Sequence, residues 1–224
     1  MSRSPSAAAA AASQAAHYIL YLVTDAGLSH GRSHLGIVEA AIRGGVTIVQ
    51  YREKNASTRR MIEEADVLCR LCRASGISFI VNDRLDVALA VEADGIHVGQ
   101  DDMPASRARR LLGRNKILGV SAGSVEEARK AVDDGADYIG ASPVFSTPTK
   151  PDAPPPLGIE GLRRITQAVQ IPVVAIGGIN AGNAAAMREA GAAGIAVVSA
   201  IVAAEDVEEA ARALRAAVEN VRSP

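Results

Sequence analysis

The sequence predicts a single (β/α)8 barrel, the TIM barrel, which is an α/β fold built as one domain. Short, apolar, β-branched runs alternate with amphipathic stretches of helical period, and this alternation is typical of parallel strands joined by right-handed crossovers. Eight such runs are present, which is the number that closes this type of barrel. The chain has 224 residues, 48% of them apolar, enough for one large core.

The eight expected strands follow one another along the chain. They cover residues 18–25, 46–52, 78–83, 95–98, 116–122, 138–144, 172–178 and 194–200. Residues 17–224 are expected to form the catalytic barrel domain, and the Ala- and Ser-rich residues 1–16 a disordered tail. This tail lacks the apolar region of a secretory signal, while Arg3 and the serines leave an organelle-transit segment as an alternative.

Helical periodicity fills the segments between these strands, most clearly at 58–74, 125–132, 183–190 and 207–221. A degenerate repeat supports the alternation, because a helix end, a Gly turn and a strand start recur at 41–46, 91–96, 132–138 and 189–195. Glycine permits the left-handed cap that turns the chain back toward the sheet. A doubly wound open sheet is the competing fold, but it predicts a Gly-rich dinucleotide loop after the first strand, where this chain has Thr-Asp-Ala-Gly.

The composition argues against several classes of partner. With 24 Lys and Arg against 25 Asp and Glu, the formal net charge is -1, so no basic excess exists to bind nucleic acid or an anionic membrane. No apolar stretch reaches the roughly 20 residues of a membrane helix, so a soluble, cytoplasmic protein is expected. Cys69 and Cys72 lie in the helical pattern of 58–74 and are expected to be buried structural thiols, which fits a reducing compartment.

A run of polar residues ends the second expected strand, where the sequence reads Gln50-Tyr51-Arg52-Glu53-Lys54. Because side chains alternate along a strand, Gln50, Arg52 and Lys54 are expected to point together toward the mouth of the barrel. Such a group suits phosphate oxygens, since Arg binds them in bidentate fashion and Lys as a point charge. A solvated strand end is the alternative interpretation.

Two carboxylates follow neighbouring strands. Asn82 and Asp83 end the third strand, and Asp102 follows the fourth. Mg2+ is usually held by one or two carboxylates together with ligand phosphates, so Asp83 and Asp102 are candidate Mg2+ ligands. Helix capping is the alternative role for each of them. His97, inside the fourth strand, is expected to be an interior residue with satisfied hydrogen bonds rather than a ligand.

The ends of the last two strands predict a phosphate site. Gly178 ends the seventh, while Val198 and Ser199 lie near the end of the eighth. In this fold the loops after these strands commonly bind a monophosphate through backbone N–H groups, and Gly allows close approach. A plain turn is the alternative for the Gly pair.

The loop after the sixth strand, residues 145–158, is long for a connection of its type. It carries Thr147, Thr149 and Lys150, so we expect it to be an active-site lid. The sequence shows no Ser-His-Asp pattern and no Cys-His pair.

Taken in order, these residues resemble the thiamine phosphate synthase family, from about His17 to the last helix. The resemblance implies a Mg2+-dependent transferase whose partners are phosphorylated small molecules. In that family, one substrate is 4-amino-2-methyl-5-hydroxymethylpyrimidine diphosphate, and the other is 4-methyl-5-(2-hydroxyethyl)thiazole phosphate or its carboxylated form. The thiazole nitrogen displaces diphosphate from the pyrimidine substrate. The products are thiamine phosphate and diphosphate. A cation and converging Arg and Lys side chains would stabilise the negative charge that develops on the diphosphate. The oligomeric state is left open, a homo-oligomer included.

The resemblance also implies roles for individual residues. The pyrimidine diphosphate site would comprise Gln50, Tyr51, Arg52, Glu53, Lys54, Asn82, Ser121 and Lys150. The thiazole phosphate site would comprise Thr147, Thr149, Gly178, Val198 and Ser199. The metal ligands would be Asp83 and Asp102, and Arg52, Ser121 and Lys150 would take part in the chemical step.

Gly123 is a departure from the family, because many members carry a His at this position. The segment after Lys150 is also unusually rich in proline. A thiazole tautomerase of the same superfamily, which uses a His at the position of Gly123, is one alternative function, but Gly cannot transfer a proton. A non-catalytic phosphate-sensing barrel is another, but it would not need both Asp83 and Asp102. A different phosphate-handling barrel would need an acid–base pair, which we cannot assign.

Overall fold

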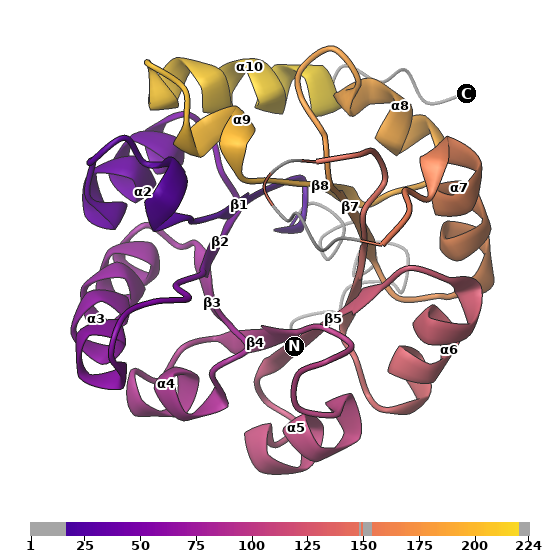
Figure 1. Ribbon diagram of the computed structural model, residues 1–224, viewed down its shortest axis with the longest axis horizontal. Coiled ribbons are helices and arrows are strands. Elements are labelled where there is room, and N and C mark those ends of the chain that lie inside the picture. The colour runs from indigo at the N-terminus through magenta and orange to yellow at the C-terminus, as the bar shows by residue number, and fades with distance from the viewer. Residues whose placement is uncertain (1–16, 148, 150–153, 220–224) are drawn as a thin grey trace, which may run out of the picture.

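The computed structural model describes residues 17–147, 149 and 154–219. Eight parallel strands form a closed barrel in the order β1 to β8, and β8 pairs with β1. Figure 1 looks down this barrel, with the strands around the centre and the helices outside them. The predicted (β/α)8 barrel is confirmed, and the open doubly wound sheet is excluded. The tail expected at 1–16 lies outside the described residues.

All eight strands occur where the apolar runs predict them. They are β1 Leu20–Val23, β2 Ile48–Tyr51, β3 Ser78–Asn82, β4 Gly95–Val98, β5 Ile117–Ala122, β6 Tyr138–Ala141, β7 Val173–Ile176 and β8 Gly194–Val197. Every strand except β4 is shorter than expected. The prediction that the eighth strand reaches residue 200 is wrong, because Ser199 already begins a short helix.

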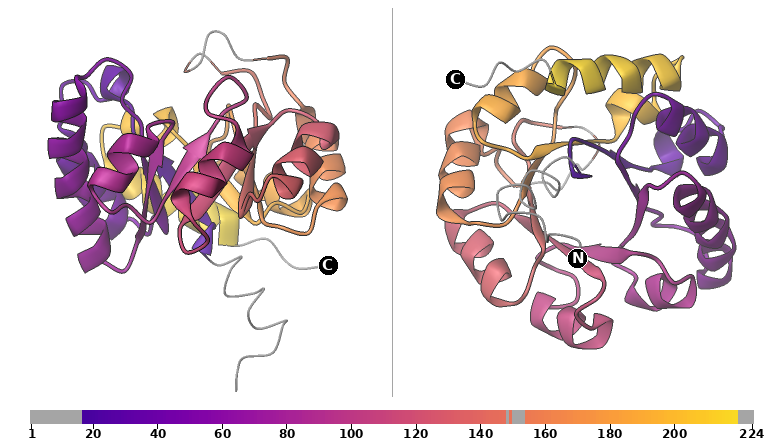
Figure 2. Two further views of the ribbon diagram at one scale, coloured as in Figure 1. Left: turned by 90° about the horizontal axis from the view of Figure 1, so that it is seen from below. Right: turned by 180° about the vertical axis from the view of Figure 1, so that it is seen from behind.

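The helices form a ring around the strands, which Figure 2 shows from the side and from behind. They are η1 Ala26–Leu28, α2 His34–Arg43, α3 Thr58–Ala74, α4 Leu85–Ala90, α5 Ala105–Leu112, α6 Val125–Asp133, α7 Gly158–Ala168, α8 Ala184–Glu189, α9 Ser199–Val202 and α10 Val207–Glu219. Serine side chains cap α2, α3 and α6 by accepting a backbone N–H, and each such cap stabilises by about 1 kcal/mol. Within the described part of the chain, no helix is long and apolar enough to cross a membrane.

The Gly turns of the internal repeat are found at three of the four junctions. Gly45, Gly135 and Gly191 have φ of 97°, 93° and 90°, the left-handed region that glycine tolerates best. At the remaining junction Glu92 takes the left-handed conformation, with φ of 54°. Gly95 instead lies inside β4, where an added Cβ would come within 2.1 Å of a backbone oxygen of β5. Glycine at position 95 therefore allows β4 and β5 to pack closely.

Two groups of side chains form the core. The larger lies between the strands and the ring of helices, and includes the free thiols of Cys69 and Cys72. Burial raises the pKa of Cys72 to about 12, which fits the predicted structural role. The smaller group lies inside the barrel and includes Tyr18, Tyr21 and Tyr138. These rings fill the lower part of the barrel and leave room above them, at the C-terminal ends of the strands.

Candidate active site

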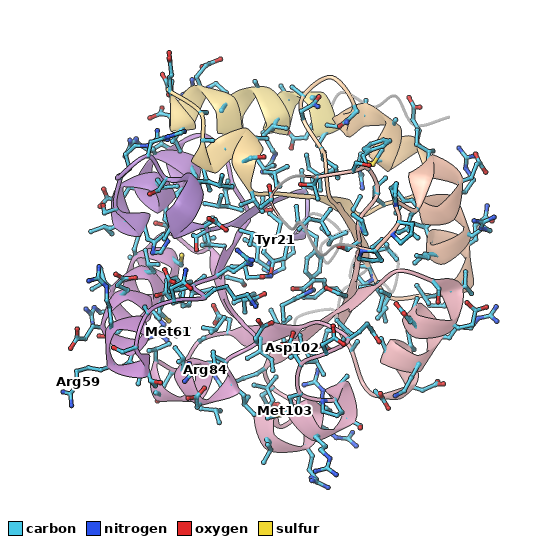
Figure 3. The ribbon with its side chains drawn as sticks, viewed as in Figure 1. Tyr21, Arg59, Met61, Arg84, Asp102 and Met103 are labelled. Atoms are coloured by element: carbon cyan, nitrogen blue, oxygen red, sulfur yellow. The ribbon has the colours of Figure 1, made fainter. Side chains whose placement is uncertain are left out.

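A cavity of about 620 Å³ lies inside the barrel mouth, and every strand contributes at least one residue to its wall. This is the end of the barrel at which enzymes of this fold have their active sites, and the volume is typical of a small-molecule site. Figure 3 shows Tyr21 near the barrel centre and Asp102 at the edge. The cavity is therefore the candidate active site.

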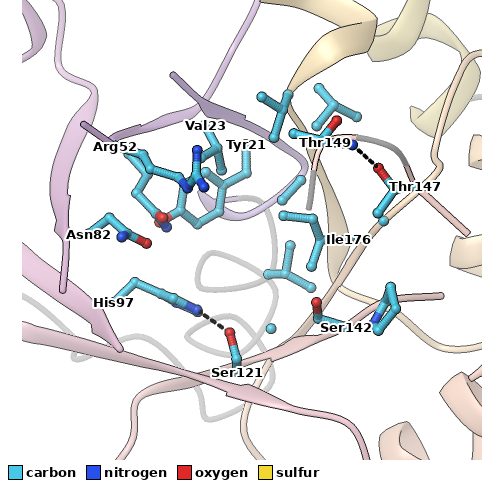
Figure 4. Close-up of a pocket in the computed structure, with 18 of the residues that line it drawn as sticks. Tyr21, Val23, Arg52, Asn82, His97, Ser121, Ser142, Thr147, Thr149 and Ile176 are labelled. Carbon is cyan, nitrogen blue, oxygen red and sulfur yellow. Dashed lines mark hydrogen bonds between the residues drawn. The ribbon is translucent and has the colours of Figure 1, made fainter. Parts of the chain in front are cut away.

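Most of the predicted site residues line this cavity. They are Gln50, Arg52, Lys54, Asn82, Asp102, Ser121, Thr147, Thr149, Gly178, Val198 and Ser199. In Figure 4, Arg52 and Asn82 lie on one side of the cavity, and Thr147 and Thr149 on the other. The two predicted substrate sites thus face each other. Lys150 lies outside the described residues.

The structure does not bring Tyr51 and Glu53 into the cavity. Tyr51 is buried behind β2, where its hydroxyl donates to Glu64 of α3 at 3.0 Å. Glu53 accepts the backbone N–H of Asn55 at 2.7 Å. Both follow from the alternation of side chains along the strand, which sends every second residue of the run away from the barrel axis.

The two cations at the end of β2 are each held by a carboxylate. Arg52 donates to Asp25 at 2.5 Å, and Lys54 donates to Asp83 at 2.6 Å. Asp25 also accepts the N–H of Leu28 at 3.2 Å and so caps η1. Arg52 is accordingly oriented at the cavity wall by a residue that sequence reasoning missed.

Asp83 and Asp102 lie beside each other at the rim. Burial, together with the neighbouring Asp102, raises the pKa of Asp83. The pKa of Asp102 is lowered, although burial opposes this, through its coupling to Asp83 and the hydrogen bond that it accepts from the N–H of Gly99 at 2.8 Å. Asp83, the first residue after β3, has a left-handed backbone with φ of 60°. Two converging carboxylates of this kind supply the hard oxygen ligands that Mg2+ requires.

No larger metal-binding group is present in the described residues, where no three His, Cys, Asp or Glu side chains cluster suitably. A site of two carboxylates leaves several coordination positions for water and phosphate oxygens, as is usual for Mg2+. The donor set at Asp83 and Asp102 therefore fits the predicted ion.

A chain of hydrogen bonds crosses the floor of the cavity. Gln50 Nε2 donates to the hydroxyl of Tyr21 at 2.8 Å, and that hydroxyl lies 2.8 Å from the hydroxyl of Tyr138. Tyr138 lies 2.9 Å from Nδ1 of His97, and Nε2 of His97 lies 2.8 Å from Oγ of Ser121. Both ring nitrogens of His97 thus have partners, as expected for an interior residue. Burial lowers its pKa to about 4, so the ring is neutral near pH 7.

The opposite wall is formed by a tight turn after β7. Gly177 and Gly178 have φ of 105° and 64°, and the loop after β6 packs directly against them. An ideal Cβ on Gly178 would lie 2.7 Å from the backbone oxygen of Ser146. Thr147 follows at once, and its Oγ1 accepts the N–H of Thr149 at 3.3 Å. Gly178 therefore permits contact with the loop that carries the two threonines.

Sequence reasoning missed several polar residues of the cavity, among them Tyr21, Tyr138, Ser142 and Asn180. Strand alternation could have identified the first three, since Tyr21 lies on the inner face of β1, Tyr138 begins β6, and Ser142 directly follows β6 at an even spacing from Tyr138. The signal was weak because buried tyrosines are equally typical of a barrel core.

Comparisons with known proteins show which family the chain resembles. The model of a family described as thiamine monophosphate synthase matches residues 20–201. The thiamine-phosphate synthase of Chloroflexus aurantiacus is 67% identical over 172 residues, which cover 77% of this chain and 79% of the relative. That of Syntrophomonas wolfei is 54% identical over 174 residues, covering 78% and 83%.

Solved structures give the same result. The thiamine phosphate pyrophosphorylase of Pyrococcus furiosus superposes with a TM-score of 0.86 at 46% identity, covering 93% of this chain and 99% of that one. A thiamine phosphate pyrophosphorylase from Bacteroides thetaiotaomicron, at 19% identity and a TM-score of 0.67, shows similarity of the fold alone.

Proposed function

The chain belongs to the thiamine monophosphate synthase family, and we propose that it is the transferase that joins the pyrimidine diphosphate to the thiazole phosphate. One observation carries the proposal beyond family membership: a single cavity has Arg52 and Lys54 on one wall and Gly178 with Ser199 on another. Two phosphorylated substrates need two such walls, placed so that their reacting atoms meet between them. A soluble cytoplasmic location and the absence of nucleic-acid partners belong to this proposal.

The pyrimidine diphosphate occupies the side of β2 to β5 in this proposal. Arg52 and Lys54 contact the diphosphate oxygens, and Asn82 and Ser121 contact the remainder of the substrate. Asp25 holds the guanidinium of Arg52 at 2.5 Å, so part of its side-chain entropy is lost before the substrate arrives. Asp25 is accordingly a positioning residue for Arg52.

In this proposal Asp83 and Asp102 would hold a Mg2+ ion, which when bound would supply positive charge for the diphosphate leaving group. The raised pKa of Asp83 beside Asp102 supports a cation here, because two neighbouring carboxylates and a diphosphate repel one another. Lys54, which donates to Asp83, supplies one positive charge to the same rim.

The reaction needs no nucleophile from the protein, since the thiazole nitrogen itself attacks the methylene carbon. Negative charge grows on the diphosphate as the bond breaks, and preorganised cations stabilise that charge better than water does. Arg52, and Lys150 from the loop after β6, are the proposed cations. His97 is neutral at pH 7, with a pKa of about 4, and both its nitrogens are engaged.

The test is to mix the purified chain with both substrates and Mg2+ and to detect thiamine phosphate by mass spectrometry. Chelation should abolish turnover, and an Asp83→Asn, Asp102→Asn double variant should lose Mg2+ binding measured by calorimetry. Arg43→Gln is a suitable control, because that residue pairs with Glu208 on the outer surface. Full activity of the double variant in chelator would refute the metal site, and no product under any condition would refute the function.

The same protein distinguishes the isomerase. NMR of the thiazole carboxylate phosphate should show no enzyme-dependent interconversion of tautomers. Gly123 has no side chain to transfer a proton, and its N–H donates to Glu127 at 2.7 Å. Rapid isomerisation without synthesis of thiamine phosphate would favour the tautomerase.

A further inference from the structure

The loop that follows β1, residues 25–32, lies between the two substrate walls. In the barrel β1 pairs with β2 on one side and with β8 on the other. The loop therefore stands between Arg52, which follows β2, and Ser199, which follows β8 at the start of α9. The described wall of the cavity includes none of residues 25–32, yet this loop contacts both sides.

The first end of the loop holds the pyrimidine side. Asp25 accepts from Arg52 at 2.5 Å and from the N–H of Leu28 at 3.2 Å. The hydroxyl of Ser29 then donates to the backbone oxygen of Ala26 at 2.9 Å, and Ser29 is only 4% exposed. These bonds make the loop a compact turn rather than a loose connection.

The other end of the loop holds α9 through Arg32. Its Nη2 donates to the backbone oxygen of Val202 at 2.7 Å, and its Nη1 donates to that of Ala204 at 2.6 Å. Its Nε donates back to the oxygen of Ser29 at 3.0 Å. Figure 1 shows α9 close to the start of α2, near the junction of β8 and β1. One planar guanidinium thus joins the loop to α9, in a geometry that a lysine ammonium cannot reproduce.

The short helix α9 depends on such external contacts. A single helical turn is unfavourable in isolation, and no side chain caps the amino end of α9. The last carbonyl groups of a helix lack partners within it and carry partial negative charge, and Arg32 satisfies that of Val202. At the opposite end, Ser199 and Ala200 line the cavity. The position of Ser199 therefore depends on how the far end of α9 is held.

We propose that Arg32 is a positioning residue for the transfer reaction, which fixes the thiazole phosphate wall relative to the pyrimidine diphosphate wall. The inference rests on the proposed function for the identity of the two substrates. Arg32 acts through Ser199, and the compact loop connects it to Asp25 and Arg52. The two reacting atoms belong to different substrates, and a displacement of about 1 Å can cost on the order of 100-fold in rate.

A groove on the outer surface gives access to Arg32. It has a volume of about 470 Å³ and is lined by Arg32, Arg43, Asp206 and Glu208, among others. A small cation from solvent can therefore reach the place of the Arg32 side chain when that side chain is removed. Arg43 offers a matched control in the same groove, because it pairs with Glu208 of α10 at 2.8 Å.

The first experiment uses no substrate and measures amide hydrogen exchange by mass spectrometry. The amides of Val202 and Ala203 close the turn of α9, so their exchange reports local opening of this helix. In Arg32→Gln they should exchange about tenfold faster, the scale of one lost hydrogen bond, while peptides from β7 stay unchanged. Arg43→Gln should exchange as the wild type does. Equal exchange in Arg32→Gln and the wild type would overturn the proposal.

The second experiment separates positioning from stability by steady-state kinetics. Arg32→Ala should raise the KM of the thiazole phosphate and lower kcat, each about tenfold, with the KM of the pyrimidine diphosphate constant. A merely structural role would lower kcat through loss of folded enzyme and leave both KM values unchanged. Arg32→Lys should give intermediate values, and it tests the proposal even where the alanine variant fails to fold.

An unchanged KM of the thiazole phosphate in both folded variants would overturn the proposal. Absence of thiamine phosphate from the wild type would refute the proposed function instead, and the exchange experiment would still decide whether Arg32 holds α9.

The third experiment restores the missing group. Guanidinium chloride at low millimolar concentration should bring the KM of the thiazole phosphate in Arg32→Ala back toward the wild-type value, because the ion can donate to the same carbonyl groups. Sodium chloride at equal ionic strength should not, and Arg43→Ala should not respond to either salt. Absence of rescue in folded Arg32→Ala would show that packing of the side-chain stem holds α9, which would overturn the role of the guanidinium.

Discussion

Replacing Gly178 by alanine should perturb both the stability of the barrel and the thiazole phosphate site. The residue has φ of 64°, in the left-handed region that residues with a Cβ avoid. The added Cβ would lie 2.7 Å from the backbone oxygen of Ser146 and 2.8 Å from Cβ of Phe145. The loop after β6 must therefore move, and Thr147 moves with it.

Two costs add in Gly178→Ala. The left-handed backbone costs about 1–2 kcal/mol for any residue with a Cβ, and forcing an extra methyl into a packed contact costs about 1–3 kcal/mol. The variant should lose roughly 2–5 kcal/mol of unfolding free energy in total. Gly76→Ala separates the terms, because Gly76 has φ of 68° but no atom within 4 Å of its added Cβ. It should lose only about 1–2 kcal/mol.

The measurements are urea unfolding of both variants and the KM of each substrate. Gly178→Ala should raise the KM of the thiazole phosphate more than that of the pyrimidine diphosphate, and Gly76→Ala should change neither. The reasoning fails if the two variants lose equal stability, since the loop contact would then cost nothing. It also fails if the pyrimidine KM alone rises, because the two substrate sites would be exchanged.

Three further predictions concern other parts of the chain. The pKa of His97 is about 4 in the folded protein, against an ordinary value of 6.5, so the unfolded state binds the proton more readily. At about 1.36 kcal/mol per pKa unit, this difference contributes about 3 kcal/mol to the free energy of unfolding above pH 6.5. That contribution should be lost as the pH falls to 4. Urea unfolding against pH should show a flatter curve for His97→Gln than for a control variant of the exposed His30. Cys69 and Cys72, whose thiol pKa values are raised chiefly by burial, should resist iodoacetamide until urea unfolds the chain, and labelling of the native protein would contradict their burial. Lys150→Ala should lower kcat at least about tenfold, the loss of a charge-assisted contact, with unfolding free energy unchanged; an unaltered kcat would make the loop a linker.

The order and position of the strands could be predicted because short apolar runs that alternate with amphipathic helical stretches are typical of the strands of a parallel α/β fold. The strand ends were less accurate. At β8 the apolar pattern continues through Val198, but Ser199 begins α9, because hydrophobicity does not distinguish a buried strand end from the first turn of a buried helix.

The polar residues at strand ends could be predicted because the barrel brings the C-terminal ends of its strands to one mouth. Tyr51 and Glu53 were included through family resemblance, although alternation along β2 already separated them from Gln50, Arg52 and Lys54. The pairing of Arg52 with Asp25 could not be foreseen, since it joins residues that follow two different strands and whose side-chain conformations depend on tertiary packing.

The pairing of β1 with β8 has a consequence for folding during synthesis of the chain. The N-terminus leaves the ribosome first, so β1 can pair with β2 early but cannot pair with β8 until residues 194–197 have emerged. Until then β1 and β7 present open sheet edges, which are prone to wrong pairing with other chains. The cavity also lacks the wall that β8 supplies. A chain interrupted before Gly194 should therefore be inactive and prone to aggregation. The last strand both closes the barrel and supplies a wall of the active-site cavity.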